Sequence, residues 1–309
     1  MSYYLGIDGG GTKTTCAVGD DSRLLVTATA GPSNIVRVGE DQARESLQRS
    51  VRQACAAAGI APEQVARTCV GGSGAARPER ATRVRAFLAE ILPGAIDVVG
   101  DMEIALEAAF HAGPGVIVIA GTGSIAYGRD PQGKTVRAGG WGFAIGDEGS
   151  AHWIGREAVR ATLQAADLAD GDLIQHSPFA AALGKVWGVK SISDLARAAN
   201  STPPPDFSAF LPAVVSSTDE IAVRVQTQAG RELARIAAAV SHRLFDESQT
   251  VTLATTGGVF RHSLIVREMF AREVTTQRPR TKIQSQLIEP VEGALRIARR
   301  SIGAGVAAQ

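Results

Sequence analysis

The stretch at residues 4–15, YLGIDGGGTKTT, decides the fold. A short apolar run ends in an aspartate and three consecutive glycines, and the run TTCAVG, which is rich in β-branched residues, follows after Thr12 and Lys13. Glycine-rich turns often approach phosphate groups closely, because glycine has no side chain and adopts positive φ. The familiar phosphate loops lead from a strand into a helix, whereas this turn predicts a hairpin between two strands.

Composition favours a cytoplasmic protein that binds a small molecule. The chain has 309 residues, long enough for two domains, and its 32 basic and 31 acidic residues give a net charge of +1. No basic stripe indicates nucleic-acid binding, no signal peptide is expected, and the apolar runs are too short to span a membrane. Cys16, Cys55 and Cys69 lie far apart without metal-ligand spacing, as expected for buried thiols in a reducing compartment.

Hydrophobic periodicity predicts the same strand–loop–strand plan twice. In the first part we expect strands at 3–7, 14–20, 23–30, 65–72 and 95–101 and helices at 41–60, 77–92 and 103–112. In the second we expect strands at 116–120, 125–128, 135–138, 251–258 and 281–288 and helices at 150–168, 219–245, 261–270 and 289–303. Ser150 is the expected N-cap of its helix, and Gly230 is a candidate break in the long helix.

This duplication predicts an α/β protein with two domains. We expect the first at residues 1–112 and the second at 113–289, with inserted helices at about 165–215. The C-terminal helix at 290–309 is expected to pack back on the first domain.

Three glycine loops close predicted strands, at Gly9–Thr12, Gly121–Ser124 and Gly257–Gly258. The hydroxyls of Thr12, Thr122 and Ser124 add donors beside exposed backbone amides, which suits phosphate oxygens. A chain with 34 glycines forms tight turns in any case. Because two of the three loops occupy matching positions of the repeat, we favour phosphate binding.

Two aspartates follow predicted strands. Asp8 either holds Mg²⁺, which prefers oxygen ligands, or caps the turn. Asp101 either positions and deprotonates a substrate hydroxyl for phosphoryl transfer or is the N-cap of the next helix.

The stretch GGWGFAIGDEGS at 139–150 has the composition of a ligand wall, with mobile glycines, one indole and two carboxylates. Its carboxylates alternatively favour the start of the following helix through the helix dipole. Asn34, which follows a Gly-Pro turn, either forms a hydrogen bond with a sugar hydroxyl or forms an Asx-turn. His152 and His262 lack metal-ligand spacing.

The motifs GIDGGGTKT, VVGD, IAGTGS, GGWGFAIGDEGS and TTGGVF together resemble the BadF/BadG/BcrA/BcrD ATPase family and, within it, the N-acetylglucosamine kinases. The resemblance covers essentially the whole chain. It implies a duplicated actin-like, ribonuclease H-like fold of the hexokinase type, with two lobes around a central cleft. It also implies an ATP- and Mg²⁺-dependent kinase that phosphorylates the 6-hydroxyl of N-acetylglucosamine, glucosamine or a related sugar.

The resemblance also assigns roles to residues at the matching positions. Asp101 is the implied general base, and Asp8 the implied Mg²⁺ residue, acting through water. The implied ATP-binding residues are Gly10, Gly11, Thr12, Lys13, Gly121, Thr122, Gly123, Ser124, Gly257, Gly258 and His262. The implied sugar-binding residues are Asn34, Gly74, Asp101, Gly140, Trp141, Gly142 and Asp147.

Two alternatives stay open. One is an ATPase that couples hydrolysis to a partner protein; its relatives hold an iron–sulfur cluster through cysteines near the second phosphate loop, which here reads IAGTGSIAYG without cysteine. The other is a sugar sensor without catalysis. The family resemblance also implies a homodimer.

Overall fold

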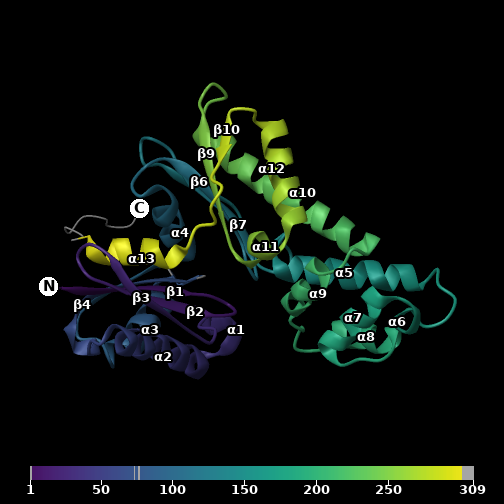
Figure 1. Cartoon of the computed structure of the whole chain (residues 1–309), viewed down its shortest axis with the longest axis horizontal. Coiled ribbons are helices and arrows are strands. Elements are labelled where there is room, and N and C mark those ends of the chain that lie inside the picture. The colour runs from purple at the N-terminus through teal and green to yellow at the C-terminus, as the bar shows by residue number, and fades with distance from the viewer. Residues whose placement is uncertain (1, 73, 76, 301–309) are drawn as a thin grey trace. The chain divides into compact units, whose positions relative to one another are not determined.

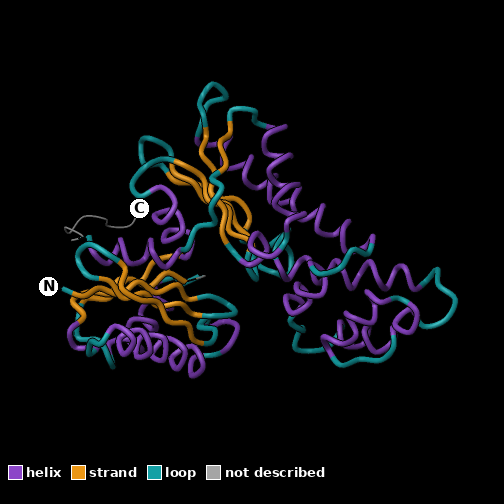
Figure 2. Tube along the Cα trace, in the orientation of Figure 1, coloured by secondary structure: helices purple, strands orange, loops and turns teal. Residues whose placement is uncertain are grey.

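The computed structural model describes residues 2–72, 74–75 and 77–300, which form two compact units (Figure 1). Unit 1 extends to Gly113 and resumes at Ile288, whereas unit 2 covers Pro114–Leu287. Each unit contains one five-stranded sheet with helices packed against it, as the strands and helices in Figure 2 show.

Unit 1 contains the first predicted strand plan. Its elements are β1 (Tyr3–Gly9), β2 (Thr14–Gly19), β3 (Leu24–Ala30), α1 (Ile35–Val38), α2 (Glu40–Ala58), the 3-10 helix η1 (Pro62–Gln64), β4 (Val65–Gly72), α3 (Pro78–Ala89), β5 (Ala95–Gly100), α4 (Asp101–Phe110) and α13 (Pro290–Arg299). The sheet order is β3-β2-β1-β4-β5, in which β1, β2 and β3 form the predicted antiparallel meander. Strands β4 and β5 run parallel to β1, so their carboxyl ends meet at one edge.

Both faces of this sheet are covered by helices (Figure 1). On one face, Leu47 of α2 and Val84 of α3 pack with Leu5 and Ile7. On the other, α13 approaches β1 so closely that a Cβ atom at Gly6 would lie 2.3 Å from the backbone nitrogen of Leu295. The missing side chain of Gly6 therefore lets α13 lie directly on β1, where Val291 and Leu295 pack against Ala17.

The C-terminal helix is shorter than predicted. It ends at Arg299, whereas the sequence pattern indicated helix to residue 303. Residues 301–309, the rest of the segment expected to pack on the first domain, lie outside the described residues.

Unit 2 repeats the plan of unit 1. Its elements are β6 (Gly115–Ala120), β7 (Ser124–Arg129), β8 (Thr135–Gly139), α5 (Ala151–Ala166), α6 (Leu173–His176), α7 (Pro178–Trp187), α8 (Ile192–Ala199), the 3-10 helix η2 (Phe207–Phe210), α9 (Leu211–Val215), α10 (Glu220–Leu244), β9 (Val251–Thr256), α11 (Gly258–His262), α12 (Leu264–Gln277) and β10 (Thr281–Ile283). Its order, β8-β7-β6-β9-β10, matches that of unit 1 strand for strand, with an antiparallel meander and two parallel strands. The predicted duplication is therefore confirmed.

Three details of unit 2 differ from the sequence prediction. Helix α10 continues through Gly230 without a break. The glycine instead makes room for α12, since a Cβ atom at this position would lie 2.8 Å from Cβ of Met269. The helix predicted at 261–270 is two helices, with Ser263 capping the second by accepting from Val266 N at 3.0 Å. The last strand ends at Ile283, not at residue 288.

Short helices fill the segment between α5 and α10. Trp187, Phe207 and Phe210 pack their rings together there, with centroids 4.4–6.3 Å apart. This cluster joins α7 and η2 to the core of unit 2, because Phe207 and Phe210 are both buried.

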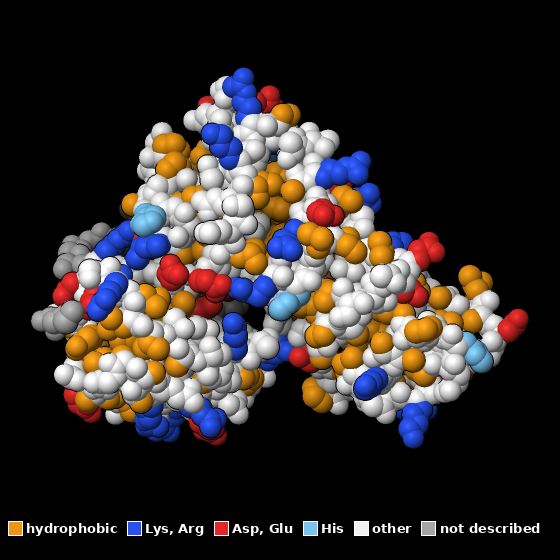
Figure 3. All heavy atoms as spheres, viewed as in Figure 1, with side chains coloured by type: hydrophobic (Ala, Val, Ile, Leu, Met, Phe, Trp, Pro, Cys, Tyr) orange, Lys and Arg blue, Asp and Glu red, His pale blue; other side chains and the backbone are white. Residues whose placement is uncertain are grey.

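The described surface carries charges of both signs. On the face in Figure 3, basic and acidic side chains are interspersed among uncharged and hydrophobic ones. Every helix in the described part of the chain is too short or too polar to span a bilayer.

Candidate active site

The first glycine loop is a tight hairpin turn between β1 and β2. The amide of Gly10 donates to the carbonyl of Lys13 at 2.9 Å, and the carbonyl of Gly10 accepts from the amide of Ser33 at 3.1 Å. Below the turn, the buried hydroxyl of Thr14 donates to that of Ser33 at 2.7 Å. The turn is thereby pinned to the chain after β3, while Thr12 and Lys13 are exposed at its tip.

Asp8 and Asp101 lie at the same edge of the unit 1 sheet. Asp8 is near the end of β1 and Asp101 directly follows β5; β4 runs between these strands, with Gly72 paired to both Gly9 and Gly100. Burial raises the pKa of Asp8 to about 7, the Asp101 carboxylate adds to this shift, and Lys13 opposes it. The two carboxylates repel each other, so a proton or a cation that binds beside them is stabilised.

The structure also bears on the simpler interpretations of both aspartates. No backbone amide among the described residues donates to the Asp8 carboxylate, so turn capping does not account for this side chain. Gly100, not Asp101, is the N-cap of α4. Asp101 is the first residue of that helix, and its Oδ1 accepts from the adjacent amide of Met102 at 3.0 Å.

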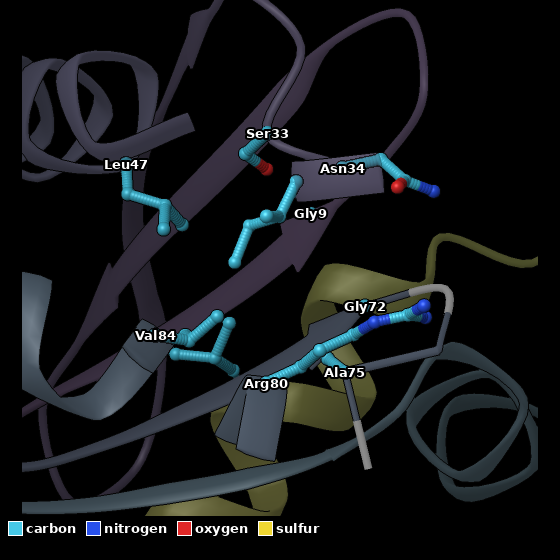
Figure 4. Close-up of a pocket in the computed structure, with 10 residues that line it drawn as sticks. Gly9, Ser33, Asn34, Leu47, Gly72, Ala75, Arg80 and Val84 are labelled. Atoms are coloured by element: carbon cyan, nitrogen blue, oxygen red, sulfur yellow. The ribbon is translucent and has the colours of Figure 1, made fainter. Parts of the chain in front are cut away.

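A small pocket opens beside this edge within unit 1 (Figure 4). Its lining residues are Gly9, Ser33, Asn34, Ile35, Leu47, Val70, Gly72, Ala75, Arg80 and Val84. Asn34 is the one predicted sugar-binding residue among them. Its Oδ1 accepts from the amide of Val36 at 3.1 Å and caps α1, which is the Asx-type contact considered above. The side-chain NH₂ of Asn34 is a separate donor.

Sequence reasoning missed Ser33 and Arg80 as pocket residues. Arg80 lies in the first turn of α3 and reaches the turn before this helix, where its Nη1 is 3.5 Å from the carbonyl oxygen of Gly74. Gly74, a predicted sugar-binding residue, has φ 67° and so requires glycine-like freedom. The sequence signal that could have identified Arg80 is a basic residue shortly after the glycine-rich stretch that follows β4.

The second glycine loop, in unit 2, is tied to the start of α5. The amide of Gly121 donates to the carbonyl of Gly123 at 3.0 Å, and the amide of Ala151 donates to the carbonyl of Gly121 at 2.8 Å. The Ser124 hydroxyl donates to the carbonyl of Glu148 at 2.7 Å. Ser150 is the N-cap of α5, accepting from Trp153 N at 3.1 Å, as predicted.

Asp147 joins this loop to the stretch at 139–150. Its Oδ1 accepts from the amide of Gly142 at 3.2 Å. Burial raises the pKa of this carboxyl, while the amides of Gly142 and Ser124 oppose the rise. Asp147 also has φ 58°, which aspartate tolerates better than most residues. Its carboxylate therefore organises the loops of unit 2.

Trp141 and its neighbours present an aromatic face to solvent. The Trp141 side chain is 67% exposed, and the guanidinium carbon of Arg137 lies 4.9 Å from its ring centroid. Gly140 and Gly142, on either side, have φ 68° and 97°. The glycines thus let the backbone turn so that the indole projects outward.

Gly257 brings the third glycine loop against the second within unit 2. Gly257 has φ 106°, and a Cβ atom there would lie 2.3 Å from the carbonyl oxygen of Ala120, at the end of β6. Gly258 begins α11 and His262 ends it. These predicted nucleotide residues and the loop at Gly121 therefore belong to one edge of one sheet.

The carboxylates of this site could hold a metal ion that takes its other ligands from a bound phosphate and water. No cluster of three or more His, Cys, Asp or Glu in the described ranges could hold a metal by itself. Mg²⁺ in phosphate-transferring sites usually takes one or two carboxylates together with phosphate oxygens and water. Asp8, whose carboxyl group interacts with the charge of Asp101, offers oxygen donors of this kind.

The three cysteines belong to unit 1, whereas the second glycine loop belongs to unit 2. Cys16 is in β2, Cys55 in α2 and Cys69 in β4, and all three are buried free thiols of unit 1. Burial raises the pKa of the Cys55 thiol to about 11 and shifts the pKa of Cys16 and Cys69 upward too. These thiols therefore stay protonated near neutral pH, whereas the ligands of iron–sulfur clusters are thiolates.

Comparisons with known proteins find sugar kinases that are similar to this chain over nearly its full length. An N-acetylmuramic acid/N-acetylglucosamine kinase from Clostridium acetobutylicum is 32% identical over 314 residues, which cover 97% of this chain and 99% of that protein. The crystal structure described as an N-acetylglucosamine kinase from Chromobacterium violaceum has a TM-score of 0.76 and 26% identity, covering 96% and 99% of the two chains.

A more distant structure supports the fold alone. The glucokinase of the ROK family from Streptomyces griseus, crystallised with glucose and AMPPNP, has a TM-score of 0.63 and 15% identity, with 96% of this chain and 99% of that chain covered. The fold is therefore the predicted hexokinase type. Finally, the model of the BadF/BadG/BcrA/BcrD ATPase family matches residues 5–298. On this evidence the chain belongs to the BadF/BadG/BcrA/BcrD ATPase family.

Proposed function

We propose that this protein is an ATP-dependent kinase that transfers the γ-phosphoryl group to the 6-hydroxyl of N-acetylglucosamine, glucosamine or a related amino sugar. The family and the sugar kinases named among its relatives support this reaction. The observation that carries the proposal is the pair Asp8 and Asp101 at one edge of the unit 1 sheet, beside a pocket.

In this proposal Asp101 orients the sugar hydroxyl and accepts its proton as the oxygen attacks phosphorus. Phosphoryl transfer requires mainly positioning and charge stabilisation, and a correctly placed base contributes about 10²–10⁴-fold. Asp8 would hold Mg²⁺ through water, and the ion when bound would neutralise charge on the phosphate oxygens. Asn34, Gly74, Gly140, Trp141, Gly142 and Asp147 are proposed to contribute to sugar binding.

The glycine loops are proposed to bind the nucleotide. Thr12 and Lys13 are exposed at the tip of the first turn, and the glycines leave the backbone of both loops without side chains in the way, which suits phosphate oxygens. The proposed phosphate-binding residues are Gly10, Gly11, Thr12, Lys13, Gly121, Thr122, Gly123 and Ser124. Gly257, Gly258 and His262 are proposed to lie at the adenosine.

The test compares the wild type with Asp101→Asn, which keeps the size of the side chain and removes the base. Sugar phosphate is measured by mass spectrometry and ADP by a coupled assay, over a panel of amino sugars and hexoses. We expect the variant to bind ATP normally and to lose phosphorylation by about 10²-fold or more. Near-normal turnover would remove Asp101 from this role.

The same assay separates the alternatives. A kinase forms sugar phosphate in step with ADP. Release of ADP without sugar phosphate, stimulated by another protein, would instead indicate a coupling ATPase, and sugar binding without turnover would indicate a sensor.

We further propose that the enzyme acts in the cytoplasm as a homodimer. Three buried free thiols and the need for ATP support this location. The dimer rests on family resemblance alone, and light scattering of the purified protein tests it.

A further inference from the structure

Arg137 lies on β8, between two residues that pack against the core of unit 2. Val136 and Ala138 contact that core, and because successive side chains of a strand point to opposite faces, the Arg137 side chain is left on the outer face. Its backbone is held from two sides. Arg137 is paired with Tyr127 of β7, and its carbonyl oxygen accepts from Nη1 of Arg243 at 2.9 Å. The side chain therefore extends from a fixed part of the sheet.

The chain that follows β8 is rich in glycine. Gly139, Gly140 and Gly142 have φ angles of 75°, 68° and 97°. Glycine adopts such angles without steric cost, but it loses more conformational freedom on ordering than any other residue. Trp141 stands among these glycines with an exposed side chain. A defined position of its indole therefore depends on contacts that the neighbouring glycines cannot supply.

The guanidinium of Arg137 makes three contacts with this turn. Its Nη1 donates to the carbonyl of Gly140 at 3.3 Å and to that of Gly139 at 3.5 Å. Its guanidinium carbon lies over the Trp141 ring, 4.9 Å from the ring centroid. In the described ranges this guanidinium forms no ion pair with a carboxylate. The group thus serves the turn and the indole and is not used for charge pairing.

The planar shape of the guanidinium allows these contacts at the same time. Its N–H groups donate in the plane to carbonyl oxygens, while its face stacks on an aromatic ring. Because Arg137 covers one face of the indole and the Trp141 side chain is still exposed, the opposite face remains accessible to a ligand.

We propose that Arg137 is a positioning residue, which holds the indole of Trp141 in the orientation that binds the sugar. The apolar C–H groups of a pyranose ring can pack on the open face of an aromatic side chain. When the turn is ordered in advance, sugar binding does not bear the entropic cost of ordering it. This inference rests on the proposed kinase function and adds to its sugar site a residue that contacts Trp141, not the sugar.

Steady-state kinetics of Arg137→Gln and Arg137→Lys test this role in the full-length protein, with the amino sugar that the wild type phosphorylates fastest. We expect Arg137→Gln to raise the KM for the sugar about 2–5-fold, as for the loss of one cation–π contact at an exposed site. The kcat and the KM for ATP should stay unchanged, because the lost contact affects only sugar binding. Arg137→Lys keeps the charge but lacks the planar fork, so its KM for the sugar should be close to that of Arg137→Gln.

Acrylamide quenching of tryptophan fluorescence tests the contact without turnover. Trp141 is exposed, whereas the other two tryptophans, Trp153 and Trp187, are partly buried. The difference between each protein and its Trp141→Phe version isolates the signal of Trp141. Loss of the guanidinium uncovers one face of the indole, so Arg137→Gln should raise the quenching constant of Trp141.

Lys134→Gln is the matched control for both measurements. Lys134 is exposed and directly precedes β8, so this variant removes the same charge at the other end of the strand. We expect the KM for the sugar and the quenching constant of Lys134→Gln to match those of the wild type.

Three results would overturn the inference while the kinase function stands. They are an unchanged KM for the sugar in Arg137→Gln, an equal effect of Lys134→Gln, and full recovery of the wild-type KM in Arg137→Lys, which would show that charge alone acts. If the wild type phosphorylates no sugar, the proposed function falls and this inference falls with it. A changed quenching constant would then show only that the contact between Arg137 and Trp141 exists.

Discussion

The carboxylate of Asp147 packs so closely on Gly123 that a Cβ atom at Gly123 would lie 2.7 Å from Asp147 Oδ2. Gly123 belongs to the second glycine loop, and Asp147 also accepts from the amide of Gly142. One carboxylate therefore holds together two loops that we propose to bind different substrates.

Gly123→Ala should disturb this arrangement without unfolding unit 2. The added methyl group forces the carboxylate to shift, so the contact with Gly142 is lost; we expect KM for ATP to rise about 10-fold, as for one lost charge-assisted hydrogen bond. Steady-state kinetics of Gly123→Ala, Asp147→Ala and the double variant test this. If the two effects simply add, the residues act independently and the coupling is absent. Asp147→Asn is the conservative control, because asparagine keeps an acceptor and tolerates positive φ.

Asp8 should make the free protein less stable as pH rises. Burial raises the pKa of Asp8 to about 7 in the folded state, against 3.8 for a free aspartate, so between these pH values the folded state keeps a proton that the unfolded state has lost. The contribution of Asp8 to the free energy of unfolding therefore falls between about pH 4 and pH 7 and stays constant above pH 7. Asp8→Asn removes this loss and should be more stable than the wild type by about 1–3 kcal/mol at pH 8.

Thermal unfolding at pH 5 and pH 8, without nucleotide or divalent ions, measures this difference. The stabilisation by Asp8→Asn should be larger at pH 8. An identical gain at both pH values would show that the carboxyl is not perturbed. Asp41→Asn, at an exposed position of the same unit, is the control.

Asn34 can be tested as a cap and as a sugar ligand separately. Asn34→Ser keeps an oxygen that caps α1, whereas Asn34→Ala removes it. If the side-chain NH₂ binds sugar, Asn34→Ser should raise the sugar KM about 10-fold while the melting temperature stays near that of the wild type. A normal KM for Asn34→Ser would leave capping as the function of this residue.

Gly293 should be essential for packing α13 on α4. A Cβ atom at this position would lie 1.9 Å from the carbonyl oxygen of Ile104, so the helix would have to move away. We expect Gly293→Ala to lower the free energy of unfolding by about 2 kcal/mol or more, measured by urea denaturation. Glu292→Ala, one residue earlier on the same helix, should stay within about 0.5 kcal/mol of the wild type. Equal stability of both variants would contradict the close approach.

The sequence was informative wherever short-range pattern sets the backbone. Strand and helix periods, the hairpin after Gly9 and the cap at Ser150 depend on neighbours in the chain, and the repeat follows from their order. The predicted break at Gly230 was wrong, because the packing of α12 and not local propensity explains that glycine.

Local pattern by itself determined the doubled strand plan, the glycine loops and the aspartates that follow β1 and β5. Only the tertiary structure decided that Arg80 shares a pocket with Asn34 and that Gly257 lies against the end of β6. It also decided that the Asp147 carboxylate accepts hydrogen bonds from amides of its own unit. The physical reason is that propensity and periodicity constrain φ and ψ within a segment. Which side chains meet depends instead on sheet order and on how closely distant backbones approach.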